Sequence, residues 1–269
     1  MTNTDIQVQD QVEPQAIHDP TDILDDEALQ AIDEAEARAQ AYEDQAADQA
    51  ANADQAPAVD FQTMLGAVTD DQVQGLQAAL ATEFGERARF ERDANPNNDS
   101  IQKTLTKLQG ILSKPGTLRS LVATGTGAGP INRSEVTGKR RNVYAIEKMA
   151  DLLYGAVTGH LKNAVNIAVF SSLVKVQNAG LPFTTEVAKA ATSDKIAVDN
   201  QLKGLLIRHT VAESTASTQQ SSTMTALEDL GVVANTGTRG RPVYTLLDNP
   251  LSRRLVEITK GQHGCEVTA

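Results

Sequence analysis

The residues whose types and spacing are most suggestive of chemistry lie between positions 210 and 247. A run of short polar side chains there is followed by arginines on a glycine-rich turn, and the candidates are Gln219, Gln220, Ser222, Thr223, Arg239 and Arg241. Gln can pair bidentately with adenine, and Ser and Thr can bond base edges or phosphates. Arginines on a turn can bind phosphates or enter a minor groove. The chemistry indicated is hydrogen-bonded recognition of a polyanion.

Two capping boxes predict the elements that position these residues. Thr210 with Glu213, and Ser217 with Gln220, have the S/T-x-x-E/Q spacing that marks a helix start. We therefore expect a short helix, a tight turn and a second helix that begins at Ser217. The second helix would bury one apolar face, which consists of Met224, Leu227 and Leu230.

A β-hairpin is expected directly after this second helix. Gly231 follows the last apolar residue, where a left-handed C-cap favours glycine. Val232 and Val233 begin a strand, and residues 242–247 return as a second strand after a turn-rich tip at 235–241.

This order of elements resembles the winged helix-turn-helix DNA-binding superfamily. The resemblance rests mainly on ALEDLGVV at 226–233 followed by GRPVYTL at 240–246. It implies that the helix from Ser217 reads the major groove, while Arg239 and Arg241 on the hairpin contact phosphates or the minor groove. The resemblance is confined to the C-terminal part of the chain, where residues 180–209 also have the pattern of a helix-turn-helix.

Charge divides the chain into an acidic arm and a basic body. The net charge is −11, but residues 1–60 contain 16 Asp and Glu against one basic residue, Arg38. Residues 101–260 contain 11 acidic and 20 basic residues. This asymmetry is typical of an acidic tail joined to a polyanion-binding domain. The arm either competes with DNA, contacts a protein partner, or only keeps the chain in solution.

The expected fold class is mainly α: a helical body, a C-terminal winged helix-turn-helix with a small β-hairpin wing, and a disordered acidic arm at the N-terminus. We expect a disordered arm at 1–60, a helical hairpin at 61–113 and a flexible linker at 114–141. A helical core with the winged helix would follow at 142–260, and a frayed tail at 261–269. Possible phosphate contacts outside the winged segment proper are Lys139, Arg140, Arg141, Lys195, Lys203, Arg253 and Arg254.

Residue types argue against several other classes of protein. Cys265 is the only cysteine, so neither an intrachain disulfide nor a cysteine zinc site is expected. No apolar run approaches the length of a membrane span, and the N-terminus lacks a signal pattern. Gly138-Lys139 does not belong to a phosphate-binding loop, because Arg140 follows where that motif requires Ser or Thr. We therefore expect neither enzyme activity, cofactor nor metal, and a cytoplasmic location, or a virion if the chain is viral.

Two functions remain open at this stage. The first is a double-stranded DNA-binding regulator of transcription, replication or partition. The alternative is a structural, assembly or protein-docking component of a virus or mobile element, whose winged helix does not bind DNA. A homodimer is compatible with either.

Overall fold

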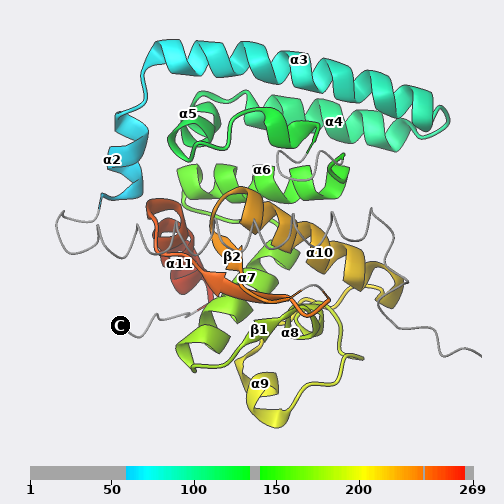
Figure 1. The fold of residues 1–269 in the computed structure, drawn as a ribbon, viewed down its shortest axis with the longest axis vertical. Coiled ribbons are helices and arrows are strands. Elements are labelled where there is room, and N and C mark those ends of the chain that lie inside the picture. Colours follow the sequence, from blue (N-terminus) through cyan, green and yellow to red (C-terminus); the bar gives the residue numbers. More distant parts are fainter. Residues whose placement is uncertain (1–58, 134–139, 239, 264–269) are drawn as a thin grey trace, which may run out of the picture.

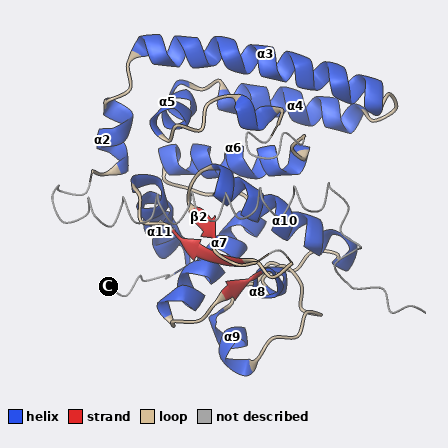
Figure 2. Ribbon diagram, viewed as in Figure 1, coloured by secondary structure: helices blue, strands red, loops and turns tan. Residues whose placement is uncertain are grey.

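The computed structural model describes residues 59–133, 140–238 and 240–263. Within these ranges the fold is mainly helical with one small antiparallel sheet near the C-terminus, which confirms the expected fold class at that level (Figures 1 and 2). The expectations for the acidic arm before residue 59 and for the tail after residue 263 lie outside the described residues. So do Lys139 and Arg239.

Four helices form the N-terminal part of the fold: α2 (Phe61–Gly66), α3 (Asp70–Ala94), α4 (Asp99–Leu112) and α5 (Pro115–Ala123). The long α3 lies outermost, with α4 and α5 between it and the rest of the molecule (Figure 1). Thr69 and Gln72 form a reciprocal capping box that begins α3. The helical pair expected here is therefore present as α3 and α4.

The segment expected to be a flexible linker is largely ordered in the described residues, so that prediction was wrong. Pro115 does not end a helix but stands at the first position of α5, where its missing N–H costs nothing. Leu118, Leu121 and Ile131 are fully buried, the last of them in a short 3₁₀ turn, η2 (Gly129–Ile131). Burial of these apolar side chains outweighs the glycine-rich composition of the segment.

Two central helices, α6 (Val143–Thr158) and α7 (Ala164–Asn178), form the start of the helical core expected within 142–260. Gly159 ends α6 in the left-handed conformation, with φ of 77°. The apolar residues of α3, α4 and α5 join those of α6 and α7 in one buried cluster that extends from Phe61 to Ile258. Within this cluster α4 packs against α6, and α3 packs against α4 and α5.

The C-terminal part surrounds the small sheet. Its elements are β1 (Phe183–Thr184), α8 (Thr185–Ala190), α9 (Asn200–Leu205), α10 (Glu213–Asp229), β2 (Val233–Asn235), β3 (Val243–Leu246) and α11 (Pro250–His263). The strand order is β1-β3-β2, with both pairs antiparallel. The expected hairpin is present, and a third strand that the sequence did not predict completes the sheet.

The expected helix–turn–helix within 210–230 is wrong, because α10 is one continuous helix. Its N-cap is Ala212, and no side chain caps it. Neither of the two proposed capping boxes forms. The helix does not begin at Thr210, and Ser217 lies in its second turn. The segment contains no Gly or Pro to break it, and Ala216, Thr223 and Leu227 are all buried on one face. Packing of that face against α6, α7 and α8 favours a straight helix over a turn.

No helix in the described ranges combines the length and apolar character that a membrane crossing requires.

Candidate nucleic-acid interface

The solvent face of α10 carries hydroxyl groups. Ser214, Ser217, Thr218 and Ser221 are all exposed, and their spacing of three and four residues places them on one side of the helix. Short hydroxyl side chains can donate to or accept from base edges and phosphate oxygens. This face contains no lysine or arginine.

Most of the residues proposed from the sequence to read DNA are not on this face. Gln220, Ser222 and Thr223 are at most 4% exposed, and Gln219 is half-buried. Thr223 instead donates a hydrogen bond from Oγ1 to Asn166 Oδ1 on α7, 3.1 Å away. The prediction was wrong because it treated Ser217 as the start of a helix. In a single helix that begins at Glu213, Ser217 and Ser221 face solvent, whereas Gln220 and Thr223 face the core.

Basic side chains lie close to the start of α10. Backbone hydrogen bonds from His209 N to Ala191 O and from Val211 N to Thr192 O hold the preceding segment beside the end of α8. Lys195 forms an ion pair with Glu213 at 2.6 Å, and Arg208 and His209 are exposed. Because no side chain caps α10, its first N–H groups and the helix dipole favour an anion at this end. Lys203, on α9, is also exposed.

The turn between β2 and β3 has a backbone that depends on glycine. A Cβ added to Gly237 would lie 2.2 Å from Arg241 O and 2.4 Å from Val243 N, which no side chain can tolerate. Asn235 accepts a hydrogen bond from Gly237 N at 3.1 Å, and Thr238 bridges to Arg241. These contacts present the exposed Arg241 at the tip of the hairpin.

Other arginines proposed as phosphate contacts already have protein partners. Arg140 lies 3.5 Å from the centroid of the Phe90 ring, and Arg141 pairs with Asp229 at the end of α10. Arg253 pairs with Asp248 at 2.8 Å, and Arg254 donates to Glu257 and to Ala156 O. Their main contribution is therefore to hold elements together.

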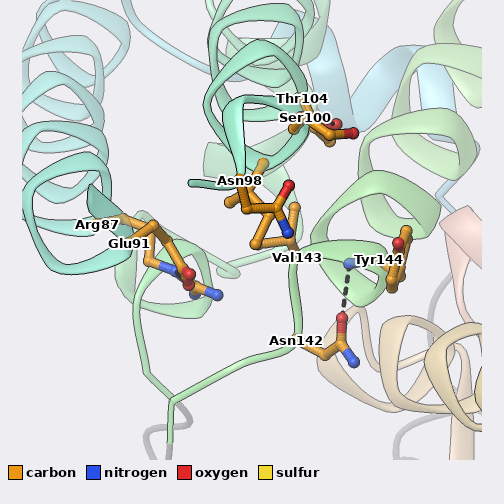
Figure 3. Close-up of a pocket in the computed structure, with 9 residues that line it drawn as sticks. Arg87, Glu91, Asn98, Ser100, Thr104, Asn142, Val143 and Tyr144 are labelled. Carbon is orange, nitrogen blue, oxygen red and sulfur yellow. Dashed lines mark hydrogen bonds and ion pairs between the residues drawn. The ribbon is translucent and has the colours of Figure 1, made fainter. Parts of the chain in front are cut away.

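A polar cavity of about 430 Å³ lies between the end of α3, the start of α4 and the start of α6 (Figure 3). At its edge, the buried Arg87 forms an ion pair with Glu91 at 2.8 Å. Arg87 also donates to Ile131 O at 3.2 Å and to Arg141 O at 2.6 Å. Asn142, which also lines the cavity, caps α6 by accepting from Tyr144 N. Arg87 thereby links the end of η2 and the residue two positions before α6 to α3.

Sequence reasoning missed the Arg87–Glu91 pair, although a signal was available. The apolar stripe of α3 runs through Leu80 and Phe84, and the next positions on the same face are 87 and 91. A charged pair four residues apart that continues an apolar stripe indicates a buried, mutually paired arginine and glutamate.

Comparison of the chain with known protein families, curated proteins and solved structures finds no match. The described residues define a mainly helical protein with a small three-stranded antiparallel sheet. They contain no group of three His, Cys, Asp or Glu side chains placed to hold a metal ion. Any functional assignment must therefore be argued from its own residues.

Proposed function

We propose that the protein is a double-stranded DNA-binding regulator that acts through a winged helix. The observation that supports this most is the order α7–β1–α8–α10–β2–β3 together with the antiparallel strand order β1-β3-β2. In a winged helix, a helix in the position of α10 enters the major groove and the hairpin lies beside it. The pair α8 and α10, joined by the long segment that contains α9, takes the place of the two helices expected within 210–230.

The proposed contact set differs from the one expected from the sequence. Ser214, Ser217, Thr218 and Ser221 replace the buried residues on the recognition helix, because these hydroxyls lie on its exposed face. Arg241 remains a contact on the wing. The uncapped N-terminus of α10, with Lys195 and Arg208 nearby, would face a phosphate.

The charge of this region predicts how the binding depends on salt. Residues 164–263 contain ten Lys and Arg and eight Asp and Glu, so their net charge is small. Few phosphate contacts are available, and the slope of log affinity against log salt should therefore be shallow. Sequence-specific hydrogen bonds would have to supply much of the affinity.

Substituting the solvent face of α10 tests the proposal. We expect Ser217→Glu/Ser221→Glu to weaken binding to double-stranded DNA at least tenfold, since two carboxylates would face phosphates. The measurement is fluorescence anisotropy with the preferred duplex selected from a random pool. Gln74→Glu/Gln77→Glu on the exposed face of α3 adds charge elsewhere and serves as the control.

The wing is tested separately with Arg239→Ala/Arg241→Ala. We expect weaker binding to all duplexes and a salt slope reduced by roughly one to two units, as each lost phosphate contact contributes about 0.9. Unchanged affinity in this variant would show that the wing assignment is wrong.

One observation favours the alternative of a protein-docking or assembly role. The solvent face of α10 is neutral, with hydroxyl groups and no cation, and such a face can also pack against a protein. If no duplex binds the full chain at low salt, the DNA proposal fails and this second function takes its place.

A further inference from the structure

Positive charge is concentrated away from the winged region. Residues 101–163 contain ten Lys and Arg but only three Asp and Glu, whereas the ten basic residues of 164–263 are nearly balanced by acidic ones. The basic segment corresponds to α4, α5, α6 and the loop that precedes α7. A polyanion-binding surface is therefore expected on these helices.

A groove of about 360 Å³ lies on this part of the fold, between α4, the start of α5 and the outer face of α6. Lys107, Lys114 and Lys162 line it around the ring of Tyr154, and we refer to it as the lysine groove. Lys114 Nζ lies 4.1 Å from the centroid of the Tyr154 ring and Lys162 Nζ lies 5.8 Å from it. One ring thus gathers two ammonium groups from segments that are far apart in the sequence.

The carboxylates of the groove are already engaged. Glu147 pairs with Lys107 at 3.4 Å. Asp151 accepts hydrogen bonds from Asn166 Nδ2 and from the backbone N–H groups of Lys162 and Asn163, at 3.0 to 3.3 Å. Asp151 therefore fixes the loop that carries Lys162, rather than neutralising its ammonium group.

Two cations in the groove consequently lack an anion. In the described part of the chain, neither Lys114 nor Lys162 has a carboxylate within ion-pair distance. Lys114 is also the N-cap of α5, a nine-residue helix whose dipole adds positive potential at the same end. An anion placed between the two ammonium groups would relieve their mutual repulsion.

We propose that the lysine groove binds a phosphate group, presented by a nucleotide or by a nucleic-acid strand. Lysine ammonium groups bind phosphate as point charges, and the groove is of the size that holds a small ligand. Tyr154 acts as a positioning residue, since its ring holds Lys114 and Lys162 over the groove. This site is separate from the winged helix and does not depend on the function proposed above.

Calorimetric titration of the full chain at low salt with pyrophosphate and with ATP, and anisotropy with a labelled DNA duplex, test this site. We expect Lys114→Gln/Lys162→Gln to weaken binding at least about tenfold, because each lysine supplies a charge-assisted contact. Arg89→Gln/Lys103→Gln removes the same charge from exposed basic residues that do not line the groove, and should retain binding. All four substituted residues are exposed, so both double variants should have the same melting temperature as the parent protein.

The three probes distinguish the source of the phosphate. Groove-dependent binding of pyrophosphate or ATP identifies a small phosphate ligand, and groove-dependent binding of the duplex alone identifies a nucleic-acid strand. The proposal is overturned if none of the probes binds, or if both double variants bind them equally. Duplex binding that depends on Ser217 and Ser221 but not on the lysines, together with no lysine-dependent binding of pyrophosphate or ATP, would leave the winged-helix function standing and remove this one.

Discussion

Replacing Arg87 by methionine is expected to lower the free energy of unfolding by about 3–5 kcal/mol. The guanidinium is 2% exposed, and it is paired with Glu91 and with the carbonyl groups of Ile131 and Arg141. Methionine fills similar space but leaves Glu91 buried without its cation and both carbonyl groups without a donor. The measurement is chemical denaturation of the purified protein.

Two comparison variants show whether the effect comes from the buried pair. Arg89→Met removes an exposed arginine two residues away and should change stability by less than about 0.5 kcal/mol. Arg87→Met/Glu91→Leu removes both charges and should recover part of the loss, since an apolar pair avoids the uncompensated carboxylate. If Arg87→Met behaves like Arg89→Met, the segment before α6 is held by other contacts.

Replacing Lys148 by methionine is expected to stabilise the protein at pH 7 by up to about 3 kcal/mol. Lys148 is 3% exposed within α6, and its Nζ donates to Asn163 Oδ1 at 2.8 Å. Burial lowers its pKa from the ordinary 10.5 to about 8, against the opposing effect of Glu147 and Asp151. Holding the charged form in this site is therefore costly for the folded chain.

The same shift predicts a dependence of stability on pH. Below about pH 8 the lysine is charged in both states, and the full cost of burial is present. As the pH rises from about 8 toward 10.5, the folded chain releases the proton while the unfolded chain still binds it, so stability rises. Lys148→Met should lack this rise.

Denaturation from pH 7 to 9.5 measures the difference between the two proteins. Above that range Tyr244 would interfere, because burial raises its pKa and its ionisation in the unfolded chain opposes folding. If the difference in unfolding free energy between the two proteins becomes smaller as the pH rises, the effect is assigned to the charge of Lys148. A constant gap would mean that methionine changes packing rather than charge.

Much of the helical framework could be predicted from local sequence. Thr69 with Gln72 marks the start of α3, the apolar stripes predict α6 and α7, and Gly231 with φ of 62° ends α10 as a glycine there should. The β-hairpin followed from valine-rich strands separated by a turn. These features are encoded by residues close to one another in the chain.

The candidate site was predicted less well. A hydroxyl residue that can cap a helix can also lie within one, and only packing decides between these positions. Burial of Ala216 and Thr223 under α6, α7 and α8 selects one continuous helix, which places Gln220 inside and Ser221 outside.

The sequence by itself determined that this protein is mainly helical, where its long helices run, and that an acidic segment precedes a basic one, because periodicity, caps and charge are local properties. Only the tertiary structure decided which side of α10 faces solvent, that α5 is a buried helix, and that β1 completes the sheet. It also brought Lys114 and Lys162 to one tyrosine ring. Each of these outcomes depends on contacts between residues distant in the chain, whose burial energy exceeds the local preferences that a sequence displays.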